Sequence, residues 1–308
     1  MAESMAESKS RWIDLLDPDE AALREAWPHE LHPNALATLL SKPAEGDEPR
    51  PKLETHGSYA FGILLLPVAV VEEDRVYYQE VDLILDVDLI LTVRKTPPNG
   101  DPLDLSSVRE SSRANGSPGM AAHLVVDAVA EGFLDLIDSV QDEIDELEDH
   151  VEQWSHQQVR RRLSELRHDL LQIRRTLGPT RDAARRVLDD RVELESGDLF
   201  PRETELHFGD AFDKLLRAGE GLELARDLIS GVRDYHQAKV AHEQNEVMKR
   251  LTVVASLLLV PTFIVGVYGQ NFDHMPELHW VTGYAFSWAI ILITTVGQLW
   301  YFRWKKWI

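Results

Sequence analysis

Two long uncharged runs near the C-terminus constrain this chain more than any other feature. Residues 251–268 and residues 280–302 contain no Asp, Glu, Lys, Arg or His. At a rise of about 1.5 Å per residue, each run can form a helix about as long as the roughly 30 Å hydrocarbon layer of a bilayer. A short loop, 269–279, separates them, and a basic tail, 303–308, follows. We therefore predict a multi-pass membrane protein with a hairpin of two transmembrane helices in contact with lipid.

Charges beside the two spans predict how the hairpin is oriented in the cell membrane. The basic residues nearest the spans are Lys249 and Arg250 before the first, and Arg303, Lys305 and Lys306 after the second. The loop between the spans carries the acidic residues Asp273 and Glu277 but no Lys or Arg. Because positive residues remain on the cytoplasmic side, we expect both termini in the cytoplasm and the loop outside.

The rest of the chain is strongly acidic. Residues 249–308 hold 5 basic and 2 acidic residues, whereas the preceding 248 hold 27 and 51. Such a surface repels nucleic acid and attracts cations, although an ordinary solvated surface explains the same charge, and both can hold together. There is no cysteine for thiolate chemistry. We find no phosphate loop, nucleophile motif or histidine-rich cluster, so we expect neither an enzyme nor a bound cofactor.

The first 117 residues predict a mixed α/β domain. An edge strand is predicted over 11–16, followed by a helix after Pro18 and a second short helix over 32–41. Segments rich in strand formers follow at 58–71, 76–86 and 88–95, with a proline-bearing loop over 42–51. Because polar and apolar residues alternate imperfectly, we expect helices to bury some strands on both faces.

Helices are predicted for almost all of the remainder. Apolar residues at helical spacing over 120–154 and an arginine-rich helix over 157–194 predict an antiparallel hairpin with partly compensating charge, within a section that we place at 118–200. A long helix begins near Thr204, because no proline interrupts residues 203–260. It forms a stalk over 201–250 and continues into the first span. Leucine or isoleucine recurs every seven residues at 215, 222 and 229, so other helices or copies of this helix should cover it.

A polar line runs along one face of the first span and the end of the stalk. At a spacing of about 3.5 residues this face carries Asp234, Ala238, Ala241, Asn245, Met248, Thr252, Ala255, Leu259, Thr262 and Gly266. Small residues on such a face allow helices to pack closely, which is one interpretation. The other is a pore lined by this face, with amide and hydroxyl oxygens at intervals and apolar constrictions at Met248 and Leu259. Two spans cannot enclose a pore, so the second interpretation requires a ring of subunits.

Five short motifs in the C-terminal part resemble a known family. They are Asn-Glu-Val-Met-Lys (245–249), Leu-Thr (251–252), Pro-Thr-Phe (261–263), Tyr-Gly-Gln-Asn (268–271) and Met-Pro-Glu-Leu (275–278), followed by a second span and a basic end. This pattern resembles the CorA family of divalent-cation channels. The resemblance implies an α+β fold, with a cytoplasmic α/β domain, a helical hairpin, a stalk helix and two C-terminal transmembrane helices. It also implies a funnel-shaped homopentamer that takes up Mg²⁺, and also Co²⁺ and Ni²⁺.

The resemblance assigns roles to individual residues. Gly269, Gln270 and Asn271 match the signature turn at the outer mouth, where Asn271 meets a hydrated ion. The matching pore positions are Asn245, Met248, Leu251, Leu259 and Thr262, to which the polar line adds Thr252. Asp234 matches an acidic residue of a cytoplasmic regulatory cation site, and a neighbouring subunit supplies its partner, either Asp86 or Asp88. Divalent cations would thus be both substrate and regulator.

The outer turn and loop leave two alternatives open. The family usually has Gly-Met-Asn where this chain has Gly-Gln-Asn. ZntB-like zinc transporters, with proton coupling as the alternative to passive flow, also vary at the middle residue. The Met-Pro-Glu-Leu and Asn-Glu-Val-Met-Lys motifs favour the magnesium branch. In the outer loop, Asp273 and Glu277 either raise the local cation concentration or only solvate the loop.

Overall fold

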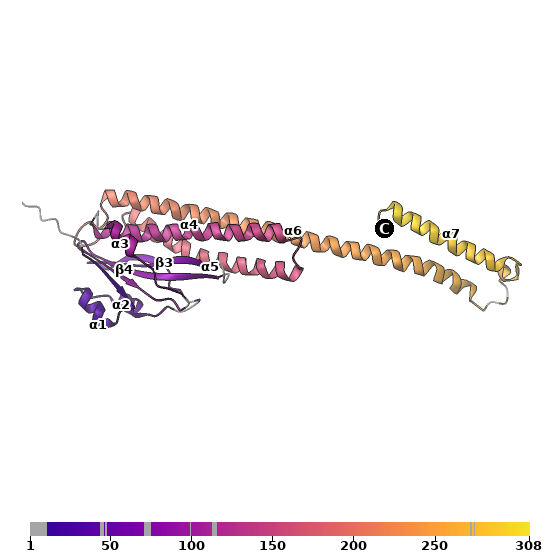
Figure 1. Ribbon diagram of the computed structural model, residues 1–308, viewed down its shortest axis with the longest axis horizontal. Coiled ribbons are helices and arrows are strands. Elements are labelled where there is room, and N and C mark those ends of the chain that lie inside the picture. Colours follow the sequence, from indigo (N-terminus) through magenta and orange to yellow (C-terminus); the bar gives the residue numbers. More distant parts are fainter. Residues whose placement is uncertain are drawn as a thin grey trace, which may run out of the picture. The chain divides into compact units, whose positions relative to one another are not determined.

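The computed structural model of the chain describes residues 11–43, 46, 48–70, 75–98, 100–112, 116–271, 273 and 275–308. It divides into two compact units, residues 1–232 and residues 233–308. Helix α6 (Arg202–Tyr268) is 67 residues long and contributes to both units (Figure 1). The predicted continuous helix from the stalk into the first span is therefore confirmed. The finer division of the chain into seven sections stays a prediction.

A five-stranded sheet forms the centre of the first unit. Its strands are β1 (Arg11–Leu16), β2 (Lys52–Thr55), β3 (Ala60–Val70), β4 (Arg75–Leu85) and β5 (Leu89–Arg94). Their order is β1-β5-β4-β3-β2, with β1 parallel to β5 and the other pairs antiparallel. The four predicted strands are confirmed, and β1 lies at an edge as expected. Strand β2 was not predicted, because four residues with two charges give too weak a signal.

Helices cover both faces of this sheet, as the imperfect alternation predicted. On one face, α1 (Glu20–Ala26) and α2 (Pro33–Leu40) bury Leu23, Trp27 and Leu39 against residues of the sheet such as Phe61 and Leu91. On the other face, α4 (Pro118–His150) packs against the strands with a second apolar core (Figure 1). Burial on two faces explains why β3 and β5 consist almost entirely of apolar residues.

A cluster of three charged side chains is buried on the face that α2 covers. Lys95 is 1% exposed, and its Nζ donates hydrogen bonds to the Thr38 carbonyl at 2.8 Å and to the Glu80 carboxylate. The same Nζ lies 2.9 Å from Asp82 Oδ2. One cation thus faces two carboxylates, and burial raises the pKa of Asp82 to about 7.

Helices α4 and α5 (His156–Leu188) form the predicted hairpin, which follows the short helix α3 (Ser106–Ser112). Ser155 begins α5 with a capping box that pairs it reciprocally with Gln158. Arg162 Nη2 lies 3.0 Å from Glu143 Oε2, an ion pair that joins the two helices. The second helix was predicted to reach residue 194 but ends at Leu188, because Asp190 adopts a left-handed backbone with φ of 53°.

The first part of α6 packs against the helices of its own unit. Its buried residues follow alternating steps of three and four: Phe208, Ala211, Leu215, Ala218, Leu222, Ala225, Ile229 and Val232. A Cβ atom on Gly221 would lie 2.7 Å from Ile137 Cγ2 of α4, and Lys214 Nζ lies 2.8 Å from Asp127 Oδ1 of α4. The seven-residue repeat is therefore covered by other helices of the same chain, one of the two predicted alternatives.

The second unit contains the rest of α6, a short 3₁₀ helix η2 (Pro276–His279) and α7 (Gly283–Trp304). Helices α6 and α7 are long and apolar enough to cross a membrane, by length and composition. Val253 of α6 and Phe302 of α7 are buried. A Cβ atom on Gly283 would lie only 2.2 Å from the carbonyl oxygen of Glu277, so the loop packs tightly on the start of α7. Both predicted spans are thus helical over most of their length.

Candidate functional site

The polar line of α6 is exposed along its whole length. All ten residues at this spacing, from Asp234 to Gly266, are exposed, including Met248 at 58% and Leu259 at 69%. The residues that are buried or half-buried in the span are Val253, Ser256, Leu257, Val260, Pro261, Ile264, Val267 and Tyr268. At 100° per residue these eight lie on a different face of the helix. The predicted line therefore stays available in the monomer, while another face is covered.

The two threonines of this line are bonded to their own helix. Thr252 Oγ1 donates to the Met248 carbonyl at 2.8 Å, and Thr262 Oγ1 donates to the Leu258 carbonyl at 2.7 Å. Each hydroxyl proton is therefore used, whereas the oxygen can still accept hydrogen bonds. Together with the side chain of Asn245, the line offers acceptor oxygens at intervals of two to three helical turns. Such oxygens can accept hydrogen bonds from the waters of a hydrated cation.

Large apolar residues are also exposed around the span. Met248 and Leu259 lie on the polar line, whereas Leu251, at 59% exposure, lies beside it. Val254 and Leu258 are exposed at 57% and 65% on the same flank as Leu251. Contiguous apolar surface of this kind marks contact with lipid or with another protein surface.

The signature turn directly follows α6. The Gly269 amide donates to the Val265 carbonyl at 2.8 Å, and the Gln270 amide donates to the Val267 carbonyl at 3.3 Å. A Cβ atom at Gly269 would approach the Val265 carbonyl oxygen to 3.2 Å, which favours glycine here. The side chains of Gln270 and Asn271 are exposed, and neither makes a hydrogen bond within the part of the chain that the structure describes. Two uncharged amides are thus presented to solvent where the helix ends.

The outer loop places its two acidic residues differently. Asp273 is exposed, whereas Glu277 is half-buried in η2. Phe272 and His274 lie outside the described residues. Neither of the two predicted roles for the acidic pair is tested by a single chain.

The three predicted regulatory carboxylates differ in their surroundings. Asp234 is exposed and its Oδ1 lies 3.0 Å from Arg233 Nη2. Asp86 Oδ1 accepts hydrogen bonds from the amides of Asp88 and Leu89 at 2.8 and 2.7 Å. Asp86 is 9% exposed, whereas Asp88 is exposed. Asp86 therefore shapes the turn between β4 and β5, and Asp88 presents its carboxylate to solvent.

No three His, Asp or Glu side chains among the described residues are arranged to hold a metal ion. A site with three such ligands from one chain is therefore absent from this part of the protein. A site shared between copies would have to draw its ligands from more than one chain.

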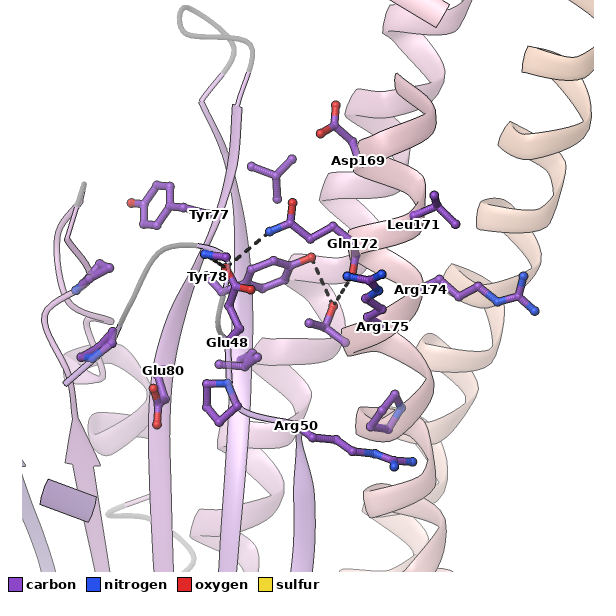
Figure 2. Close-up of a pocket in the computed structure, with 18 of the residues that line it drawn as sticks. Glu48, Arg50, Tyr77, Tyr78, Glu80, Asp169, Leu171, Gln172, Arg174 and Arg175 are labelled. Carbon is purple, nitrogen blue, oxygen red and sulfur yellow. Dashed lines mark hydrogen bonds between the residues drawn. The ribbon is translucent and has the colours of Figure 1, made fainter. Parts of the chain in front are cut away.

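A cavity of about 810 Å³ lies between β4 and α5 (Figure 2). Its charged residues are Arg50, Arg174 and Arg175, which are matched by Glu48, Glu80 and Asp169, with His168 beside them. Gln172 Nε2 donates to Glu48 Oε1 at 3.4 Å across the cavity. Because positive and negative groups balance, the cavity favours neither a cation nor an anion.

Gln298, a polar residue of the second span, was not among the predicted site residues. Its Nε2 donates to the Ser256 carbonyl of α6 at 3.3 Å. The signal was available, because an amide inside an uncharged span is unusual and generally has a partner or a function.

Comparison with known proteins agrees with this architecture. The family model of the CorA-like Mg²⁺ transporter protein matches residues 7–306. The cobalt/magnesium transport protein CorA of Thermotoga maritima is 30% identical over 284 residues, which cover 90% of this chain and 77% of that protein. The complete structure of the CorA magnesium transporter of Methanocaldococcus jannaschii superposes with a TM-score of 0.77 at 21% identity, covering 96% of this chain and 91% of that one.

The structure of a ZntB cytoplasmic domain shares the fold more distantly. The ZntB cytoplasmic domain of Vibrio parahaemolyticus superposes with a TM-score of 0.54 at 16% identity, covering 76% of this chain and 88% of that one. The match over residues 7–306 and the 30% identity to a full-length relative are much stronger. The chain therefore belongs to the CorA-like Mg²⁺ transporter protein family, whose members are membrane ion transporters and not enzymes.

Proposed function

We propose that this divalent-cation transporter takes up Mg²⁺ through a pore lined by the polar line of α6. The observation that carries the proposal is the exposure of all ten residues of this line, which lead to the exposed amides of Gln270 and Asn271. Family membership supports the ion class, and the Thermotoga maritima relative is named for cobalt and magnesium transport. Co²⁺ and Ni²⁺ would pass by the same route.

The turn suits an ion that retains its water. Mg²⁺ gives up its hydration shell reluctantly, so a site can select it by accepting hydrogen bonds from bound waters. Asn271, with Gly269 and Gln270 beside it, offers an uncharged amide oxygen. A carboxylate at this position would hold the ion too tightly for transport. Beyond the turn, the oxygens of Thr262, Thr252 and Asn245 would continue the path, with Leu259, Leu251 and Met248 as its apolar parts.

Several copies are needed to complete such a path. One chain presents a single polar line, and two spans cannot enclose an aqueous pore. We propose a homopentamer, as the family resemblance implies, in which copies of α6 surround the axis and α7 faces lipid. The positive residues beside the spans support a cytoplasmic position for both termini.

Internal Mg²⁺ would regulate the pore at acidic sites shared between subunits. Asp234 would supply one carboxylate and the neighbouring subunit's α/β domain the other. Of the two candidates, Asp88 is favoured, because its side chain is exposed. Asp86 is buried and its Oδ1 accepts two backbone hydrogen bonds, which favours a structural role. Bound cations would hold the subunits together in a closed state, and their loss would leave carboxylates that repel one another.

Zn²⁺ transport is the second candidate, favoured by the departure at Gln270 and by the fold shared with a ZntB domain. Influx of Mg²⁺ and of Zn²⁺ into proteoliposomes that contain the purified protein distinguishes the two functions. We expect Mg²⁺ influx that does not depend on a pH gradient, and slower influx of Zn²⁺. Zn²⁺ influx that exceeds Mg²⁺ influx and rises with a proton gradient would instead establish the second function.

Asn271→Ala tests the turn in the same liposomes. We expect at least a tenfold loss of Mg²⁺ influx, because each subunit loses an oxygen that meets the hydrated ion. Asn34→Ala, a substitution at the start of α2 in the α/β domain, is the matched control and should leave influx unchanged. Unaltered influx in Asn271→Ala would exclude the proposed role of the turn.

A further inference from the structure

One side-chain hydrogen bond joins the two spanning helices. Gln298 of α7 donates from Nε2 to the backbone carbonyl of Ser256 in α6 at 3.3 Å. The hydroxyl groups of Thr252, Ser287 and Thr294 in the spans instead donate to carbonyls of their own helix. Within the described part of the spans, Gln298 is thus the polar side chain that reaches across.

The bonded pair also holds unused hydrogen-bonding capacity. Gln298 Oε1 is buried and accepts no hydrogen bond among the described residues. Ser256 is half-buried and, unlike Thr252 and Thr262, shows no hydrogen bond from its hydroxyl to its own helix. A buried amide oxygen without a donor is costly in apolar surroundings, so a second bond from this hydroxyl would be favourable.

The bond lies beside a weak point of α6. Pro261 has no backbone N–H, so the carbonyl of Leu257 lacks its usual donor one turn later. Proline inside a spanning helix is a common place of bending, because the backbone there has lost a bond. Ser256, which Gln298 holds, directly precedes Leu257. The anchor is therefore on the N-terminal side of the weak point, next to the free carbonyl.

Residues of the polar line flank the same proline. Leu259 is two residues before Pro261 and Thr262 directly follows it, and both are exposed on a face of α6 other than the one in contact with α7. A bend at Pro261 would change the position of Leu259 relative to Thr262. Anchoring the segment before the bend consequently fixes where Leu259 lies.

We propose that Gln298 is a positioning residue that holds the segment of α6 before Pro261 against α7, and so sets the constriction at Leu259. It acts through Ser256 and does not touch the ion. This inference rests on the proposed pore, because a constriction has meaning only if ions pass along the polar line.

Gln298→Met tests the inference, because methionine has similar length and volume but cannot donate a hydrogen bond. Hydrogen–deuterium exchange of the full-length protein in lipid nanodiscs should rise about threefold for the backbone amides of residues 254–260 and of Thr262, the change expected for an average hydrogen bond between membrane helices. The internal Mg²⁺ concentration that halves influx should shift by a similar factor. Leu299→Met, at the adjacent and 40% exposed residue, is the matched control and should change neither quantity.

The two measurements separate this inference from the proposed function. Exchange reports the contact between helices and needs no ion flux, so a wild-type protein without Mg²⁺ influx would exclude the proposed pore but leave the contact measurable. Unchanged exchange in Gln298→Met would exclude the anchor. Faster exchange with an unchanged inhibition curve would exclude the positioning role, because the contact would then be structural only.

Discussion

The two parts of α6 use the same kind of residue for different ends. Between Arg202 and Val232, apolar side chains recur in steps of three and four and are buried against the first unit, with Leu215 at 0% exposure. Between Arg233 and Tyr268, Val253 is buried, but Leu258 and Leu259 are exposed at 65% and 69%. Because both parts are equally helical, hydrophobicity alone does not decide burial. The first part finds its partners within its own chain, whereas the second requires lipid or copies of the protein.

Truncating a leucine in each part should give the largest contrast. Leu215→Ala removes a fully buried side chain, which typically costs about 3 kcal/mol and lowers the melting temperature by on the order of 10 °C. Leu259→Ala removes an exposed side chain, so the melting temperature of the purified protein in detergent should change by less than about 2 °C. If Leu259→Ala were as destabilising as Leu215→Ala, the second part would be packed in the way that the first is.

The substitution of Leu259 also distinguishes an effect on stability from an effect on transport. Leu259→Ala should increase Mg²⁺ influx into proteoliposomes, because it widens an apolar constriction of the proposed pore. Leu292→Ala, a substitution of an exposed leucine of α7, which faces lipid in the proposed assembly, is the control and should leave influx close to that of the wild type. Equal effects of the two substitutions would contradict the assignment of the polar line as the lining.

Buried charge sharpens the comparison, because the first unit encloses ionisable side chains. Burial raises the pKa of Asp82 to about 7, well above its value in an unfolded chain. A carboxyl group whose pKa is raised on folding favours the folded state at low pH, and this advantage is lost as pH rises through about 7. Asp82→Asn should therefore raise the melting temperature at pH 8 by on the order of 5 °C.

The increase from Asp82→Asn should shrink by about a third at pH 6, because the wild-type carboxyl group is then largely protonated in the folded protein. Lys95 keeps its bond to Glu80 in this variant, so the buried cation still has a carboxylate partner. The measurement is thermal unfolding of the full chain at both pH values. An increase of the same size at pH 8 and pH 6 would show that Asp82 is ionised throughout this range in the folded protein.

Two glycines of α7 give a smaller contrast in Mg²⁺ influx within the second unit. Gly283→Ala would place a Cβ atom 2.2 Å from the Glu277 carbonyl oxygen, so the loop must move. We expect Mg²⁺ influx to fall about fivefold, because Asn271 would be displaced with the loop, for a strain of about 1 kcal/mol. Gly297→Ala, on the same helix α7 with no atom within 4 Å of the added Cβ, is the control. Equal influx in both variants would show that the loop tolerates the shift.

Sequence periodicity was sufficient for most of the fold but not for the assignment of partners. Four strands, the helical hairpin and α6 follow from local patterns, because strand formers, caps and the absence of proline act within a few residues. The burial of Leu215 and the exposure of Leu259 do not follow, since both are leucines that recur at regular helical spacing. What covers a repeat depends on residues far away in the sequence, such as Ile137 of α4 beside Gly221.

The candidate site divides in the same way. Gln270 and Asn271 could be predicted from their motif, and their exposure is consistent with that prediction. Asp86 and Asp88 could not be ranked from sequence, because both are acidic residues of one turn and differ in exposure only once the chain is folded. Gln298 could not be paired with Ser256 from sequence, because the register between two spans depends on the loop that joins them.

The smallest expected effect concerns these two carboxylates of the β4–β5 turn. Asp88→Asn should raise the internal Mg²⁺ concentration needed for half-maximal inhibition by about threefold, since one of several carboxylates in a shared site is lost and the others remain. The melting temperature should stay unchanged, because the Asp88 side chain is exposed.

Asp86→Asn should lower the melting temperature and leave inhibition by Mg²⁺ unchanged. Its Oδ1 accepts two backbone hydrogen bonds, and weakening them costs about 1 kcal/mol of stability without altering inhibition. A shift of the inhibition curve in Asp86→Asn but not in Asp88→Asn would assign the regulatory carboxylate to the more buried residue, and would mean that its turn opens when the cation binds.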